Sequence, residues 1–142
     1  MPDIQHSIPI AASVEAVYPL IATGRGFAKW WTADVTEPPG RVELGFFKRS
    51  VVYSLELMGQ TPPTYAEWLC TSHDEWAGTK LIFRLSTTAD GSVLRFTHAD
   101  WKAATDYFTG CNTTWGELMF RLKSAAEGKP RGPLFLADGF AS

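Results

Sequence analysis

Residues 103–128 read AATDYFTGCNTTWGELMFRLKSAAEG and carry the longest helical pattern of this chain. Apolar residues recur there at alternating steps of four and three, which places them on one face of a helix. That face consists of Ala104, Phe108, Cys111, Trp115, Leu118, Leu122 and Ala125. Charged residues such as Glu117 and Arg121 fall mostly off it. The stretch therefore predicts one long helix that packs this face on the rest of the protein.

The ends of this helix are marked by residues with known capping chemistry. Asp100 or Thr105 can cap the start, because a short oxygen-bearing side chain satisfies a free backbone N–H. Gly128 tolerates the left-handed geometry that ends a helix. Gly110 and Gly116 stand inside the pattern, where each costs about 1 kcal/mol relative to alanine. A face that mixes large rings with small residues suits either a tight core or the wall of a cavity.

Six runs that precede this helix have the residue pattern of β-strands. Short breaks rich in turn residues separate the last five, and such breaks join antiparallel neighbours because a parallel crossover needs a dozen residues or more. The runs are 4–10, 42–47, 51–58, 65–70, 80–86 and 93–99. We therefore expect an α+β fold, in which a curved antiparallel sheet with the first strand at an edge wraps around the long C-terminal helix.

Two short helices are expected between the first two strands. Ser13 is a suitable cap for the first, and Pro19 kinks or shortens it because proline lacks a backbone N–H. Residues 23–26, with two glycines, break this helix, and a second helical turn follows over residues 27–31.

Alternation along three of the strands predicts which side chains face the long helix. These are Ala66, Trp68 and Cys70, then Leu81, Phe83 and Leu85, and finally Leu94, Phe96 and His98.

Composition limits the classes of function. The length of 142 residues indicates one domain, and a net charge of −2 argues against a nucleic-acid interface, which needs a clustered basic face. No apolar run reaches the ~18 residues of a membrane span, and the N-terminus lacks the features of a secretory signal. We expect a cytoplasmic protein in which Cys70 and Cys111 are buried, reduced thiols. Six Trp and nine Phe predict either a large aromatic core or an apolar pocket.

Several short motifs occur in a fixed order along these elements. They are Ile10-Ala11-Ala12-Ser13-x-Glu15-x-Val17-Tyr18, then Trp30-Trp31, then Trp115-x-x-Leu118-x-x-x-Leu122-Lys123 near Glu127-x-Gly128. In order and spacing the chain resembles the START-like (SRPBCC) superfamily, and in particular the homologues of the activator of heat-shock-protein-90 ATPase. The resemblance covers about residues 3–128, so it predicts a single START-like domain at 1–128 and a tail at 129–142.

This resemblance implies a helix-grip fold with a hydrophobic cavity between sheet and long helix. It also implies binding of a lipid, polyketide or other apolar small molecule in some relatives, and cyclase or dehydratase chemistry in a few. Our main hypothesis is therefore a soluble, non-catalytic binding protein for an apolar small molecule, with His98 as its polar anchor. The expected ligand contacts are Trp68, Phe83, Phe96, His98, Phe108, Cys111 and Trp115.

Two other classes of function remain open. One is an enzyme of the cyclase or dehydratase kind that uses His98 with Asp100 or Glu67 as acid and base. The other is a chaperone-associated accessory protein, which the family name implies. Two titratable groups within hydrogen-bond reach in one pocket would favour the enzyme.

The sequence gives no reason to expect a cofactor or a metal. His73, Asp74 and Glu75 are adjacent on a turn, where three neighbouring side chains cannot easily converge on one ion, so we expect a solvated hairpin tip. Gly24 and Gly26 do not form the phosphate-binding loop that follows a strand.

The last residues are more apolar than a disordered terminus usually is. The tail carries Leu134, Phe135, Leu136 and Phe140. We therefore expect it to dock, either against its own domain or against a second subunit in a homodimer.

Overall fold

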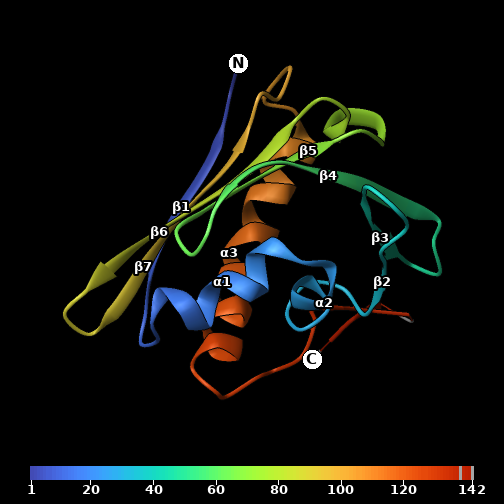
Figure 1. The fold of residues 1–142 in the computed structure, drawn as a ribbon. Helices are drawn as coiled ribbons and strands as arrows, with labels where there is room; N and C mark the ends of the chain where they lie inside the picture. The colour runs from blue at the N-terminus through green and yellow to red at the C-terminus, as the bar shows by residue number, and fades with distance from the viewer. Residues whose placement is uncertain (138, 142) are drawn as a thin grey trace.

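The computed structural model describes residues 1–137 and 139–141. Seven strands form one antiparallel sheet in the order β1-β7-β6-β5-β4-β3-β2, and the sheet curves around one long helix, α3 (Figure 1). The strands are β1 (Ile4–Ile10), β2 (Asp34–Thr36), β3 (Val42–Phe46), β4 (Val51–Thr61), β5 (Tyr65–Cys70), β6 (Lys80–Thr88) and β7 (Gly91–Ala99). The α+β helix-grip architecture is confirmed, with β1 at one edge beside β7. The short strand β2 at the other edge was absent from the prediction.

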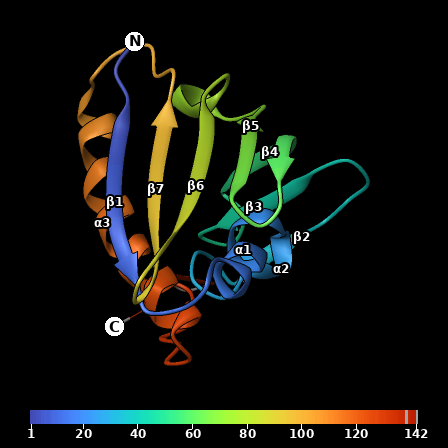
Figure 2. The same cartoon turned by 60° about the vertical axis from the view of Figure 1, so that its left-hand side comes forward.

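The inward faces of the central strands also match the prediction. All nine side chains assigned to the helix side are buried, from Ala66 on β5 to His98 on β7. They are buried because the sheet's concave face is covered by α1, α2 and α3 (Figure 2). No helix in the described part of the chain is long and apolar enough to cross a membrane.

Two short helices follow β1, as expected, although their boundary differs. Helix α1 (Val14–Ala22) is capped by Ser13, whose Oγ accepts from the Ala16 N–H at 3.2 Å, and it contains Pro19. Helix α1 ends just before the glycines, as expected, but the glycines belong to helix α2 (Gly24–Phe27), which begins earlier than predicted. A methyl group at Gly26 would overlap the Pro19 carbonyl, so glycine is required where α2 packs on α1.

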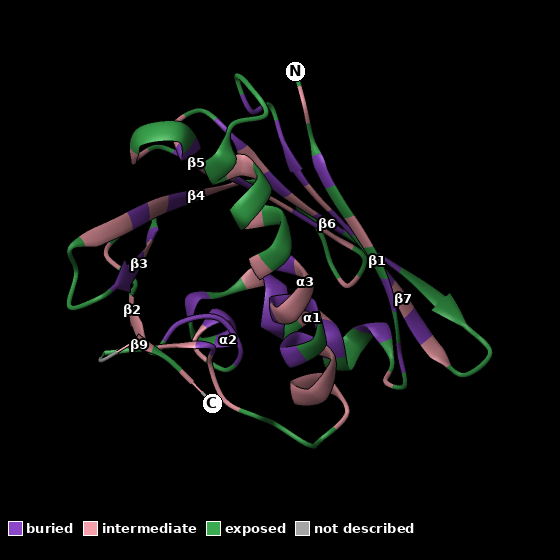
Figure 3. Ribbon diagram, turned by 180° about the vertical axis from the view of Figure 1, so that it is seen from behind, coloured by how far each residue is buried: buried purple, intermediate pink, exposed green. Residues whose placement is uncertain are grey.

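The long helix α3 spans Asp106–Ala126 and is capped by Thr105, whose Oγ1 accepts from the Phe108 N–H at 3.2 Å. Its C-terminal half is fixed to β1. Lys123 Nζ donates to the Pro9 carbonyl at 3.0 Å, and Glu127 accepts from the Ala11 N–H at 2.7 Å. Burial begins at Trp115, while the first turns are exposed or half-buried (Figure 3).

Two details of the predicted helix face need correction. Trp115, Leu118 and Leu122 are buried as expected, but Ala104 lies before the helix and is exposed. Arg121, which was expected off the face, is 2% exposed. The reason is its partners: its guanidinium Nη1 donates to the carbonyls of residues 131 and 132 at 3.2 and 3.1 Å.

The C-terminal tail returns along the short helices. Leu134 N–H donates to the Trp30 carbonyl at 3.3 Å, and Phe135 N–H donates to the Trp31 carbonyl at 2.9 Å. The Ala33 N–H donates to the Phe135 carbonyl at 2.9 Å, which completes a parallel bridge. Two short strands, β8 (Phe135–Leu136) and β9 (Gly139–Phe140), pair with each other at the end of this segment.

Candidate functional site

A cavity of about 390 Å³ lies between the first half of α3, strands β3 and β4, and the tail. This volume falls near the lower end of the ~300–1,000 Å³ range of small-molecule sites. The lining residues are Trp31, Phe46, Phe47, Val51, Tyr53, Trp76, Asp106, Tyr107, Gly110, Cys111, Thr114, Trp115, Leu118, Phe135 and Phe140.

The cavity exists because α3 packs closely only through its second half. None of residues 106–114 is buried, and a space lined by strands β3 and β4 is left beside them. Gly110 lines the cavity and is exposed, and a methyl group built there would meet no atom within 4 Å.

Aromatic rings form most of the walls. Tyr53 on β4 stacks on Trp76, with ring centroids 3.9 Å apart and planes inclined by 1°. Trp76 belongs to the 3₁₀ turn η1 (Asp74–Trp76), which connects β5 to β6. Trp31 and Trp115 lie 4.9 Å apart and each lies 6.1 Å from Trp76, so these rings continue the same aromatic cluster. Phe135 of the tail meets Phe46 edge to face at 4.9 Å.

The polar groups of the cavity gather at one end. The hydroxyl groups of Tyr53 on β4 and Tyr107 on α3 are hydrogen-bonded to each other across the cavity end. Burial raises the pKa of both, to about 12 for Tyr107 and well above the ordinary range for Tyr53. Burial also raises the pKa of the Cys111 thiol, against the influence of the neighbouring Trp76 and Tyr107 side chains. At neutral pH all three groups keep their protons.

One buried donor at this end has no partner. The indole Nε1–H of Trp76 is covered from solvent and makes no hydrogen bond within the described residues. Buried polar groups are nearly always paired in folded proteins, so each exception requires an explanation.

His98 lies in the core behind the cavity, where two protein groups use its ring nitrogens. The Trp115 Nε1–H donates to His98 Nδ1 at 3.1 Å, which leaves the proton on Nε2. That nitrogen donates to Thr79 Oγ1 at 2.8 Å, and the Thr79 hydroxyl donates to the Trp76 carbonyl at 2.7 Å. Burial lowers the pKa of His98 to about 3, so the imidazole is neutral and its hydrogen bonds hold η1 and α3 on the sheet.

The other expected ligand contacts are divided between the cavity and the core. Cys111 and Trp115 line the cavity. Phe83 and Phe96 are buried behind Trp115, and the Phe96 ring lies 4.3 Å from that indole. Trp68 and Phe108 lie farther away. Trp68 Nε1 donates to the Ile21 carbonyl at 2.9 Å, and the Phe108 ring lies 5.2 Å from Trp101.

The residues considered for acid and base chemistry do not meet. His98 is buried, whereas Asp100 is exposed beside Lys80, with 3.9 Å between Oδ2 and Nζ. Glu67 accepts a hydrogen bond from the Tyr65 hydroxyl, and its strand presents Trp68 rather than Glu67 to the core. No hydrogen bond joins any two of His98, Asp100 and Glu67 in the described part of the chain.

Sequence reasoning missed Tyr53, Trp76 and Tyr107. The turn with His73 was expected to be a solvated tip, but Trp76 within it is buried at 4% exposure. An apolar ring inside a polar turn was the available signal. Of the two cysteines, Cys70 is buried as expected, and Cys111 is only partly buried because it faces the cavity. Residues 1–137 and 139–141 contain no cluster of three metal-ligating side chains.

Curved sheet, gripped helix and internal cavity define a START-like protein, and comparisons with solved structures agree. The solution structure of the Aha1 dimer from Colwellia psychrerythraea has 30% sequence identity and a TM-score of 0.79, over 91% of this chain and 98% of that one. The chain therefore belongs to the family of Aha1 homologues, the homologues of the activator of heat-shock-protein-90 ATPase.

More distant structures share the fold alone. The AHSA1-like protein from Aeromonas hydrophila has 15% identity and a TM-score of 0.66, over 92% of this chain and 96% of that one. DynU16, a protein in the dynemicin biosynthetic locus, has 14% identity and a TM-score of 0.71, over 92% of this chain and 49% of that one. No protein-family model and no curated protein matches the chain.

Proposed function

We propose that this protein binds a small apolar or aromatic molecule in the cavity between helix α3 and strands β3 and β4. The observation that carries the proposal is a cavity of about 390 Å³ whose walls are mostly aromatic side chains. Binding there removes apolar surface of both ligand and wall from water, which is worth roughly 25 cal/mol per Å². Concave apolar sites with a few polar groups are the usual form of small-molecule pockets.

Binding alone accounts for the cavity better than catalysis does. Tyr53 and Tyr107 are titratable groups within hydrogen-bond reach, which is one feature of an enzyme site. Their raised pKa values keep both protonated at neutral pH, and an efficient general acid or base needs a pKa near the working pH. The pair can orient a ligand, but it is poorly matched to proton transfer.

A neutral fluorescent dye such as Nile red tests the site directly. Cys111→Phe puts a ring into the cavity, and we expect it to weaken dye binding at least tenfold. Thr113→Phe is the matched control, because it adds the same ring to an exposed position of α3 outside the cavity. If the Cys111→Phe variant folds and binds the dye as well as the unaltered protein, the ligand site lies elsewhere.

Native mass spectrometry of freshly purified protein addresses the natural ligand. A co-purifying small molecule that is lost in Cys111→Phe and retained in Thr113→Phe supports the proposal. The observed mass also constrains the chemical formula of the ligand.

Family membership supports a second candidate, an accessory role at a heat-shock-protein-90 chaperone. The supporting observation is the 30% identity to Aha1 over nearly the whole chain. Addition of the protein to purified chaperone should then raise the chaperone's ATPase rate, and an unchanged rate argues against this role. The Aha1 structure is that of a dimer, so we also propose a homodimer, for which light scattering should give twice 15.7 kDa.

A further inference from the structure

We propose that the cavity is selective for uncharged aromatic molecules that carry an oxygen acceptor, a ketone above all, and that it excludes carboxylates such as fatty acids. The inference rests on the proposed binding function and names the chemical class of the ligand. Three features of the cavity carry it: its charges, its hydrogen-bonding groups and the shape of its walls.

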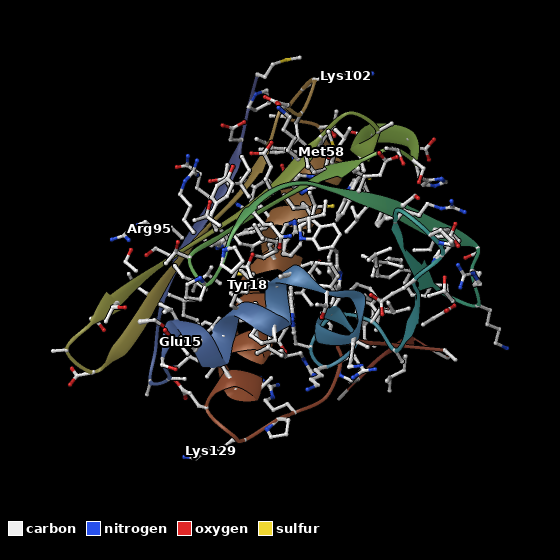
Figure 4. All side chains as sticks on the ribbon, in the orientation of Figure 1. Glu15, Tyr18, Met58, Arg95, Lys102 and Lys129 are labelled. Carbon is white, nitrogen blue, oxygen red and sulfur yellow. The ribbon has the colours of Figure 1, made fainter. Side chains whose placement is uncertain are left out.

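The charge of the lining disfavours an anion. Asp106 is the one charged side chain among the described lining residues, and no Lys, Arg or His lines the cavity. Cationic side chains such as Arg95, Lys102 and Lys129 extend from the periphery of the molecule instead (Figure 4). Asp106 also stands in the first turn of α3, where its charge offsets the positive end of the helix dipole. A bound carboxylate would therefore be desolvated without a partner, which is costly.

The hydrogen-bonding groups favour a neutral oxygen acceptor. When one hydroxyl of the Tyr53–Tyr107 pair donates to the other, the accepting hydroxyl keeps its own proton available for a third group. The indole of Trp76 lines the same end of the cavity, but its Nε1–H is covered from solvent beside Cys111, so the tyrosine pair supplies the donor. The raised pKa values of the tyrosines keep the hydroxyl donors protonated. A carbonyl oxygen, which accepts but does not donate, complements this end of the cavity.

The walls favour flat ring systems over flexible chains. The stacked rings of Tyr53 and Trp76 continue into those of Trp31 and Trp115, which together form one aromatic surface of the cavity. Aromatic surfaces of this kind interact well with other rings in stacked or edge-to-face arrangements. A rigid ligand also loses less conformational entropy on binding than an acyl chain does.

Four naphthalene probes of nearly equal size separate these contributions. They are 2-acetylnaphthalene with a ketone, 2-naphthol with a hydroxyl, 2-ethylnaphthalene without oxygen, and 2-naphthoate with a carboxylate. Dissociation constants follow from displacement of Nile red. We expect the ketone to bind about tenfold more tightly than the ethyl compound, because one buried hydrogen bond is worth about that factor. We expect 2-naphthol to lie between these two and 2-naphthoate to bind most weakly, at least tenfold below the ketone.

Two variants assign the selectivity to residues. Tyr107→Phe removes one hydroxyl of the tyrosine pair and should bring the ketone to within about twofold of the ethyl compound. Asp106→Asn removes the one charge of the described lining and should improve binding of 2-naphthoate more than that of any neutral probe. Phe120→Leu, at an exposed position of the same helix away from the cavity, is the control and should change none of the four affinities.

The outcomes distinguish this inference from the proposed function. Equal affinities for ketone and ethyl compound, or tight binding of 2-naphthoate, would overturn the inference and leave a less selective apolar site. If none of the four probes displaces the dye, and the dye itself does not bind, the proposed function fails together with the inference.

Discussion

His98 illustrates what alternation along a strand predicts and what it does not. Its position after Leu94 and Phe96 correctly predicts that it faces the interior. Alternation gives no information on Trp115 and Thr79, which lie outside this strand and are hydrogen-bonded to the two ring nitrogens of His98. Tyr53 and Tyr107 were missed for the same reason, since their contact joins residues that are distant in sequence. Such pairings depend on the assembled fold and not on local pattern.

The neutral state of His98 predicts a pH dependence of stability. Its pKa is about 3 in the folded protein and about 6.5 when unfolded, so the unfolded chain binds more protons between these values. Its contribution is complete above about pH 6.5 and is lost as the pH falls toward 3, at a rate approaching 1.4 kcal/mol per pH unit, about the value for one proton. Urea denaturation at pH 4, 5, 6 and 7 measures this slope.

His98→Gln is the variant that isolates this effect, because glutamine can accept from Trp115 but does not titrate. We expect its free energy of unfolding to fall less steeply between pH 6 and 4, with a slope smaller by about 1.4 kcal/mol per pH unit, the value for one proton. A slope identical to that of the unaltered protein would show that His98 is not the group responsible.

At the scale of elements, periodicity predicted the long helix and six of the strands, because their patterns are local and strong. It could not predict the burial of Arg121, whose guanidinium pairs with Glu117 on the same helix and also needs the backbone carbonyls of the returning tail. Strand β2 has three residues, too few to show an alternation. The cavity likewise depends on how far α3 stands from β3 and β4, which no single element encodes.

Arg121 should hold the tail against α3. Arg121→Met keeps most of the side-chain volume but leaves the carbonyls of residues 131 and 132 without their donor. An unsatisfied buried group costs about 1–3 kcal/mol, so we expect a loss of stability in that range and faster proteolysis within residues 129–137. Melting temperature and limited proteolysis measure the two effects.

Arg131→Met is the matched control for this prediction. It removes an exposed ion pair with Glu117, and such pairs contribute about 0–1 kcal/mol. If the two variants lose equal stability, the buried guanidinium does not have the anchoring role assigned to it.

At the scale of the whole molecule, the cavity is assembled from parts of the chain that are distant in sequence, including the segment after α2 (Trp31) and the turn η1 (Trp76). The sheet supplies Tyr53, α3 supplies Cys111, and the tail supplies Phe135 and Phe140. The motif order predicted the START-like fold and a cavity between helix and sheet. It did not predict that the tail lines the cavity, because residues 129–142 lie outside the resemblance.

Deletion of residues 131–142 tests the role of the tail. We expect a lower melting temperature, because Leu134 and Phe135 lose their contacts, and weaker dye binding, because the wall made by Phe135 and Phe140 is gone. Light scattering on the same sample shows whether the tail also joins subunits: the mass halves if it does. Unchanged stability and dye affinity would show that the tail is not part of the site.

The most direct test of ligand binding in this cavity uses the indole N–H signals of the protein in NMR spectra. Titration with 2-acetylnaphthalene should shift the Trp76 signal, since its ring lines the cavity beside the Tyr53–Tyr107 pair. The Trp30 and Trp68 signals should stay in place, because these N–H groups already donate to the Leu20 and Ile21 carbonyls in the core. An unchanged Trp76 signal at saturating ligand would contradict ligand binding in this cavity.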